Sequence, residues 1–194
     1  ASNVNLGTPT FTDNCSVSEV TVSNNAPTLF PIGTTTVVWT IKDAAGNTVT
    51  CNQIVTVIDN QTPSIVSCAA PANVNADSGS CTASNVNLGT PTFTDNCSVS
   101  GITITNNAPT VFPIGTTTVI WTIKDAAGNT VTCNQTVTVK DNQAPSIVSC
   151  AAPVTVNADS ESCTASNVKL TVPTFTDNCS VSEVTVSNNA PTLF

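Results

Sequence analysis

Short segments rich in aspartate and asparagine hold the residues with the clearest potential for chemistry. Asp59, Asp95 and Asp125 each stand in or next to a turn-forming sequence. Carboxylate and amide oxygens are the hard ligands that calcium prefers, usually about six to eight at once. The sequence therefore offers a set of candidate calcium ligands, namely Asp59, Asn60, Asp95, Asn96, Asp125, Asp141, Asn142 and Asp177.

Nine cysteines form the second reactive set, and the chain has no histidine that could join them in a metal cluster. This composition favours disulfides over zinc ligation. Disulfides persist in oxidising compartments, so we expect an extracellular protein, either secreted or on a cell surface. Redox catalysis is disfavoured because no two cysteines stand in a CxxC motif.

The charged residues exclude several classes of function. Four lysines and no arginine stand against 12 acidic residues, which gives a formal net charge of −8. Without histidine or arginine, the chain cannot build a Ser-His-Asp system or a bidentate clamp for phosphate. The negative charge disfavours nucleic acid, and no segment is apolar and long enough to insert into a membrane. We expect a protein that is not an enzyme; a glycosidase with two acids in a cleft is the remaining catalytic alternative.

The chain is a tandem repeat in which each residue corresponds to the one 82 positions later. Between 1–82 and 83–164, 70 of 82 positions are identical without a gap, and 165–194 matches 1–30 at 27 positions. All nine aspartates fall at four repeat positions, and each full period has four cysteines. The repeat is therefore the unit in which single residues have to be interpreted.

Two proline-containing segments, 59–63 and 141–145, predict linkers, because they combine turn formers with a residue that cannot donate to a strand ladder. They divide the chain into three domains. Residues 1–60 form a repeat that lacks its first strands, 61–142 form one complete repeat, and 143–194 form a repeat that lacks its last strands. We expect an elongated array cut from a longer repeat protein.

Within the complete repeat, runs of alternating apolar residues predict strands. Val119, Trp121 and Ile123 share one face of 116–124, and the segment 130–140 alternates in the same way. The intervening 125–129 contains a glycine and predicts a hairpin turn. About seven short strands, one buried tryptophan and no helical periodicity indicate an all-β fold of tandem immunoglobulin-like β-sandwiches.

Five segments of this repeat and its C-terminal linker form a recognisable pattern. They are Thr-Asp-Asn-Cys (94–97), Phe-Pro-Ile-Gly-Thr-Thr-Thr-Val-Ile-Trp-Thr (112–122), Asp-Ala-Ala-Gly-Asn (125–129), Val-Thr-Cys (131–133) and Pro-Ser-Ile-Val-Ser-Cys (145–150). In order and spacing they resemble the hyalin repeat (HYR) family. The resemblance implies an extracellular immunoglobulin-like module of long adhesive surface proteins. The near-identity of adjacent copies resembles the adhesin shafts of gliding bacteria.

Four cysteines in a repeat allow three pairings. Cys133 lies on the apolar face of the last strand and Cys97 ends an earlier one, so a bond between them could join separate parts of the sandwich. Cys68 and Cys81 flank a turn-rich stretch that a second bond could close. With their repeat images, the predicted pairs are Cys15–Cys51, Cys68–Cys81, Cys97–Cys133 and Cys150–Cys163, which leave Cys179 unpaired within the sequence.

The predicted fold brings the candidate calcium ligands together where two repeats meet. In a sandwich, the loop after the strand that ends near Cys97 and the turn 125–129 lie at one end, where the linker with Asp59 arrives. The arrangement resembles the junctions of cadherins and of bacterial immunoglobulin-like proteins, where calcium stiffens the linker. The alternative is that these residues only form turns, because Asp and Asn side chains bond their own backbone.

The most favoured function is structural and adhesive: repeats joined end to end form the shaft of a surface adhesin or fibre. In the alternative function, each repeat is a glycan- or protein-binding module with its own ligand site. Neighbouring repeats are the expected partners, and an exposed strand edge in 1–60 also allows lateral assembly into a filament.

Overall fold

The computed structural model describes residues 1–15 and 17–194, and almost all of its regular structure is strand. The two helical segments are single 3₁₀ turns, η1 (Val17–Glu19) and η2 (Val181–Glu183). The all-β prediction is therefore confirmed. The chain forms two compact units: the first contains Ala1–Pro63, Asp95–Thr103 and Lys124–Thr130, and the second contains Ser64–Thr94, Ile104–Ile123 and Val131–Phe194.

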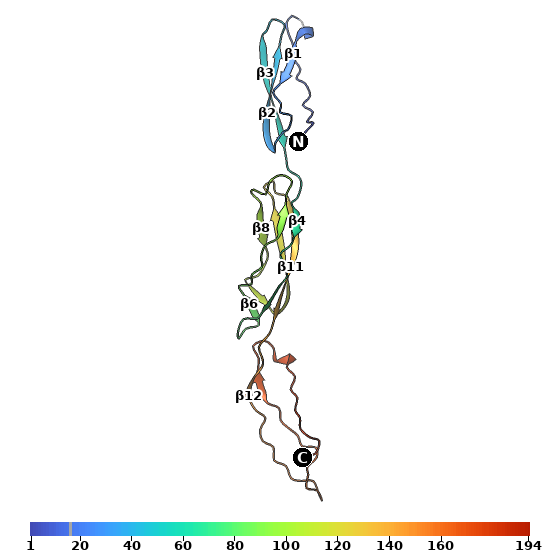
Figure 1. Cartoon of the computed structure of the whole chain (residues 1–194), viewed down its shortest axis with the longest axis vertical. Helices are drawn as coiled ribbons and strands as arrows, with labels where there is room; N and C mark the ends of the chain where they lie inside the picture. Colours follow the sequence, from blue (N-terminus) through green and yellow to red (C-terminus); the bar gives the residue numbers. More distant parts are fainter. Residues whose placement is uncertain (16) are drawn as a thin grey trace. The chain divides into compact units, whose positions relative to one another are not determined.

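A four-stranded sheet in the order β5-β11-β10-β8 forms the centre of the complete repeat. The long strands β10 (Gly115–Lys124) and β11 (Thr130–Lys140) are neighbours, as the alternating pattern predicted. They are flanked by β8 (Thr103–Asn106) and β5 (Ala72–Asn75). Figure 1 labels β8 and β11 of this sheet. Strand β5 runs parallel to β11, so an early strand of the repeat is joined directly to its last strand.

Two short antiparallel ladders complete this repeat. Strand β4 (Ser64–Ser67) pairs with β7 (Thr92–Thr94), and β6 (Thr82–Ser84) pairs with β9 (Val111–Pro113). Between β6 and β7 the chain is irregular. Asn85 and Gly89 cause the interruption, because both adopt the left-handed conformation, with φ of 54° and 67°.

Trp121 lies at the centre of a small apolar core. Its side chain is 4% exposed and packs with buried residues from four strands and two connecting segments: Ala69, Ala76, Ala83, Phe112, Val119, Val137 and Val139. Few of these side chains are large, so the core gains stability from a modest apolar area. The interpretation of Trp121 as a core residue is confirmed.

Gln135 is a polar residue inside this core and is only 1% exposed. Its Oε1 accepts a hydrogen bond of 2.9 Å from the indole Nε1 of Trp121. Its Nε2 donates to the backbone oxygens of Ala70 at 2.6 Å and Leu88 at 2.8 Å. One side chain thus satisfies the tryptophan and fixes two irregular segments, which explains how a glutamine is tolerated at the centre of the sandwich.

The disulfide in the structure differs from the predicted pairs. It joins Cys68, at the end of β4, to Cys133 on β11, with a Cα–Cα distance of 6.0 Å. The pairs Cys68–Cys81 and Cys97–Cys133 are therefore wrong, and the members of Cys15–Cys51 and Cys150–Cys163 are free thiols. Alternation correctly placed Cys133 toward the core, where Cys68 also packs. Cys97 instead lies in an exposed loop.

The Cys68–Cys133 bond closes a loop with a sequence separation of 65 residues. The chain-entropy treatment of such a loop gives about 4 kcal/mol of stabilisation. For a repeat with so small a core, this covalent link is a substantial part of the stability.

The first repeat forms a three-stranded sheet of β1 (Thr21–Asn24), β2 (Gly33–Lys42) and β3 (Thr48–Val57). Its core contains Phe30, Val37 and Trp39. In the described part of the chain β3 is an edge strand, whereas its repeat equivalent β11 is covered by β5. Residues 143–194 contain one ladder, of β12 (Ser146–Ser149) with β13 (Thr174–Thr176).

We predict that Gln135→Ala lowers the free energy of unfolding of the complete repeat by roughly 3 kcal/mol, because it leaves the Trp121 N–H and two carbonyls without their partner inside the core. Urea unfolding followed by tryptophan fluorescence measures this loss. The neighbouring exposed Asn134→Ala is the control and should change the free energy by less than about 0.5 kcal/mol. Equal effects of the two substitutions would contradict this role of Gln135.

Candidate metal site

Three segments of the first unit bring acidic side chains together. Asp59 lies two residues after β3, Asp95 directly follows β7, and Asp125 begins the turn between β10 and β11. Each position follows the end of a strand, where Asp and Asn cap the free backbone groups. The first unit therefore concentrates negative charge where the linker 59–63 approaches two loops.

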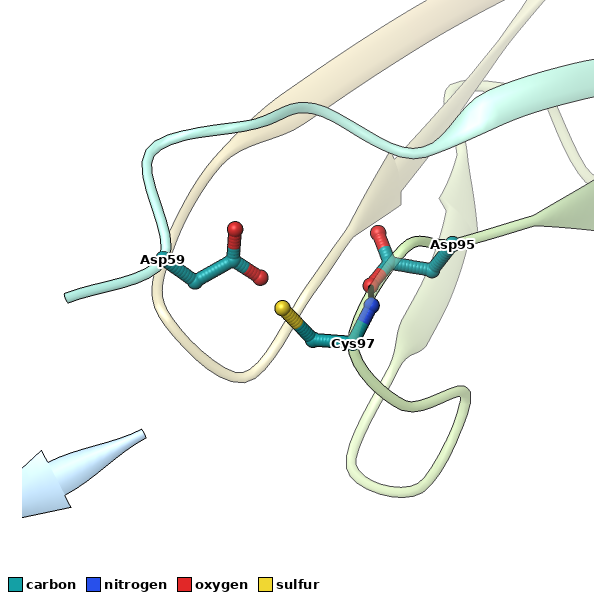
Figure 2. A group of neighbouring side chains, drawn as sticks. All are labelled: Asp59, Asp95 and Cys97. Carbon is teal, nitrogen blue, oxygen red and sulfur yellow. Dashed lines mark hydrogen bonds between the residues drawn. The ribbon is translucent and has the colours of Figure 1, made fainter. Parts of the chain in front are cut away.

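Figure 2 shows that the Asp59 carboxylate and the Cys97 thiol point toward one another, with the Asp95 carboxylate beside them. One carboxylate oxygen from each aspartate and the Cys97 Sγ all lie within 4.8 Å of one another. The backbone N–H of Cys97 donates to Asp95 Oδ1 at 2.9 Å, so this loop folds around the Asp95 side chain. The spacing is short enough for one cation to touch all three side chains.

The second oxygen of Asp95 is the most informative atom of this group. Asp95 Oδ2 is buried and accepts no hydrogen bond from the residues that the structure describes. A buried carboxylate oxygen without a partner is costly, and native proteins avoid it unless an ion or a water molecule fills the place. This atom therefore fits a cation ligand better than a turn-forming role.

Asp125 is buried, with 5% of its surface exposed, but its oxygens already have partners. Its Oδ1 accepts from the backbone N–H groups of Gly128 at 2.7 Å and Asn129 at 2.8 Å, and its Oδ2 accepts from Asn129 Nδ2 at 2.8 Å. Desolvation works to raise the pKa of Asp125, yet these hydrogen bonds hold the pKa below its usual value. Asp125 thus behaves as the turn residue of the hairpin.

Asn129 connects this turn to the linker. Its Nδ2 donates both to Asp125 Oδ2 and, at 3.2 Å, to the backbone oxygen of Asp59. Asp125 therefore orients Asn129, and Asn129 fixes the backbone from which the Asp59 side chain projects. This contact gives Asp125 a positioning role beside the acidic group.

The second unit contains the same group one period later. Carboxylate oxygens of Asp141 and Asp177 and the Sγ of Cys179 lie within 4.8 Å of one another. The Cys179 N–H donates to Asp177 Oδ1 at 3.0 Å, as Cys97 does to Asp95. Here the buried atom without a partner among the described residues is Asn178 Oδ1. Two copies of the group, one period apart, argue for a property of the repeat.

The structure brings together four of the predicted ligands, Asp59 with Asp95 and Asp141 with Asp177. Asn60, Asn96 and Asn142 are exposed, and Asn96 Nδ2 donates to Cys97 Sγ at 3.0 Å. The sequence interpretation missed the two thiols beside the carboxylates. The Thr-Asp-Asn-Cys motif at 94–97 and 176–179 was the available signal, because it places a cysteine two residues after the aspartate.

Both of these thiols have a raised pKa, first because of desolvation and then because of their polar and charged neighbours. Desolvation, a hydrogen bond to Asp59 and the negative charges of Asp59, Asp95 and Asp125 raise the pKa of Cys97. Desolvation and hydrogen bonds with Cys81 and Asp141 raise the pKa of Cys179 to about 12. The thiolate is the form that binds soft metals, so these surroundings favour a hard cation held by oxygen atoms.

Comparison with known proteins identifies the type of repeat. The HYR domain family model matches residues 1–57 and 58–139. The chain belongs to the HYR domain family. Hyalin of Strongylocentrotus purpuratus is 31% identical over 194 residues, which cover 97% of this HYR chain and 16% of that protein. Hyalin of Lytechinus variegatus is 28% identical, over 94% of the chain and 36% of its own length.

A rat protein with sushi, von Willebrand factor type A, EGF and pentraxin domains is also similar, with 32% identity over 82% of this HYR chain and 4% of its own length. The chain thus spans only a minor part of the relatives it matches. The Cys68–Cys133 disulfide is typical of proteins from oxidising compartments. Over residues 1–15 and 17–194, no helix is long and apolar enough to cross a membrane.

The lowered pKa of Asp125 predicts how this HYR repeat responds to acid. A carboxyl group whose pKa is lower in the folded protein adds stability above its unfolded pKa of about 3.9, and this contribution is lost as the pH falls through the folded value. We therefore expect Asp125→Asn to lower the melting temperature most near pH 7 and to have a much smaller effect near pH 2.

Calorimetric melting curves at the two pH values test this expectation. Asp43→Asn should behave in the same way, because Asn47 donates to both Asp43 oxygens at 2.7 Å and the pKa of Asp43 is also lowered. A loss of equal size at pH 7 and pH 2 would mean that the charge of Asp125 is not what stabilises the turn.

Proposed function

We propose that this chain is part of the shaft of an extracellular adhesive protein or fibre, in which HYR repeats follow one another end to end and calcium binds at each junction. The observation that carries the proposal is the recurrence of one acidic group at both linkers, Asp59 with Asp95 and Asp141 with Asp177. Each group includes a linker residue, Asp59 or Asp141, which a junction between repeats uses and a ligand site within one repeat does not need.

The donor atoms in these groups support calcium rather than a soft metal. Each group has two carboxylates and one buried side-chain oxygen without a partner among the described residues, either Asp95 Oδ2 or Asn178 Oδ1. Calcium takes carboxylate, amide and water oxygens, and water molecules would complete its shell. Neutral thiols beside the carboxylates do not compete for a hard cation.

Calcium would join two separate segments of the chain. Asp59 belongs to the linker and Asp95 to a loop of the complete repeat, so one ion bound to both would restrain the linker. Charge repulsion between the two carboxylates opposes this arrangement until a cation neutralises it. The proposed role of the ion is therefore mechanical, and the family relationship supports a module without catalytic activity.

We predict that the chain binds two calcium ions. Titration calorimetry should give a stoichiometry of two for the unchanged chain and one for Asp95→Asn, because the substitution removes a carboxylate from one group only. With affinities typical of extracellular modules, about 10 mM calcium should raise the stability of each site by roughly 1–3 kcal/mol.

Asp13→Asn is the matched control, since Asp13 occupies the repeat position of Asp95 but belongs to neither acidic group. The control should keep the stoichiometry of two. Absence of heat and of a thermal shift at the same calcium concentration would overturn the calcium sites. The same stoichiometry in Asp95→Asn and the unchanged chain would overturn their assignment to these residues.

The shaft role predicts an extended particle in solution. A compact globule of 194 residues has a radius of gyration of about 16 Å. We expect small-angle X-ray scattering of the unchanged chain in calcium to give a value well above this, and excess chelator to broaden the distribution of distances by freeing the linkers. A radius close to that of the compact globule would exclude the shaft, and identical profiles with and without calcium would exclude stiffening by the ion.

A further inference from the structure

Two cysteines that are 98 positions apart in the sequence lie side by side in the second unit. Cys81 directly precedes β6 and Cys179 lies two residues before η2. Cys81 Sγ donates to the backbone oxygen of Asn178 at 2.8 Å, and Cys179 Sγ lies 3.8 Å from the backbone oxygen of Ser80. Each thiol thus faces the residue that precedes the other cysteine.

Contacts that do not involve sulfur hold these two segments together. Asn178 Nδ2 donates to the backbone oxygen of Ser80 at 2.9 Å and is 3.4 Å from Asp141 Oδ1. Gln143 accepts from the Gly79 N–H at 3.1 Å and donates to the backbone oxygen of Asp77 at 3.3 Å. The neighbouring polar side chains therefore bring the thiols together before any covalent bond forms.

The two thiols are also accessible to a small oxidising molecule. Both cysteines are partly exposed and line one open cavity of about 670 Å³, together with Ile114, Asp141 and Gln143. A cavity of that size accommodates a small organic molecule such as a disulfide reagent. An oxidising compartment, which the Cys68–Cys133 disulfide already implies, would also favour a second disulfide.

We propose that Cys81 and Cys179 form a disulfide that joins the complete repeat covalently to residues 143–194. The bond forms by exchange with a small disulfide such as oxidised glutathione. One cysteine attacks a sulfur of the reagent and releases the first reduced thiol. The second cysteine then attacks the mixed disulfide and releases the second, so that the two protein thiols lose two electrons and two protons while one reagent disulfide gains them.

This pairing gives Cys81 a different partner from the one predicted from the sequence. The partner, Cys179, lies in the next copy of the repeat. Cys97 is the repeat equivalent of Cys179, with Asp59 and Asp95 in place of Asp141 and Asp177. For that junction, residues 1–194 contain no equivalent of Cys81, because the corresponding position is 82 residues earlier. Cys97 is therefore an internal control, because it has the same acidic surroundings without the second cysteine. The disulfide does not depend on calcium binding.

Peptide mapping of the intact chain, refolded in reduced and oxidised glutathione and then treated with N-ethylmaleimide, tests the proposal. Trypsin cuts after Lys42, Lys124, Lys140 and Lys169, so the fragment 170–194 contains Cys179 as its only cysteine. In the monomer fraction we expect this fragment to be linked to 43–124 until a reductant is added. The number of thiols that react should fall from seven to five per chain.

Substitutions identify the partner within 43–124. Cys81→Ser should release fragment 170–194 with an alkylated Cys179, whereas Cys97→Ser and Cys51→Ser should leave the link intact. The link from Cys68 to Cys133 joins 43–124 to 125–140 and reports that the refolded chain was oxidised. If that link forms while Cys179 is alkylated, or if the Cys179 link survives Cys81→Ser, the proposal is wrong. The same map in chelator separates this result from the calcium sites.

Discussion

The indole N–H of Trp121 must find an acceptor inside an apolar core, and the complete repeat is organised around that requirement. Gln135 supplies the acceptor from the neighbouring strand β11 and uses its amide protons to hold Ala70 and Leu88. These two residues belong to irregular segments that short strand ladders alone would fix poorly. The buried amide of Gln135 thus connects the sheet to the two irregular segments that pack against it. Because this amide is fully hydrogen-bonded, its burial does not offset the stability that the small apolar core provides.

The loops that surround the acidic groups are also held by hydrogen bonds from a few polar side chains. Asp125 closes the hairpin turn by accepting three hydrogen bonds, and Asn129 extends that network to the backbone of Asp59. The turn therefore positions a linker carboxylate without itself contributing a free oxygen. Because Asp95 keeps one buried oxygen without a partner among the described residues, the turn and the proposed calcium site use different aspartates.

Local patterns were predictable from the sequence, and contacts between distant segments were not. The alternation around Trp121 and the Asp-Ala-Ala-Gly-Asn turn identified the β10-β11 hairpin, because strand periodicity and turn chemistry are properties of neighbouring residues. The predicted partner of Cys133 was wrong because the true partner depends on which strand packs across the core. The alternation of apolar residues does not contain that information. The proximity of Cys81 and Cys179 was equally hidden, since it joins two different copies of the repeat. The pairing of Asp59 with Asp95 was accessible because both positions follow the ends of strands.

The disulfide between Cys68 and Cys133 also determines which part of the repeat can bear a load. Cys68 stands near the beginning of the repeat and Cys133 near its end, so tension applied to the two ends passes from one cysteine directly to the other. The intervening chain, with a sequence separation of 65 residues, is bypassed by that tension. Fully extended, it would add roughly 220 Å to the length of each repeat. Under oxidising conditions the chain between the two cysteines cannot be extended by tension. A repeat under tension therefore keeps a nearly constant length until the sulfur–sulfur bond is reduced.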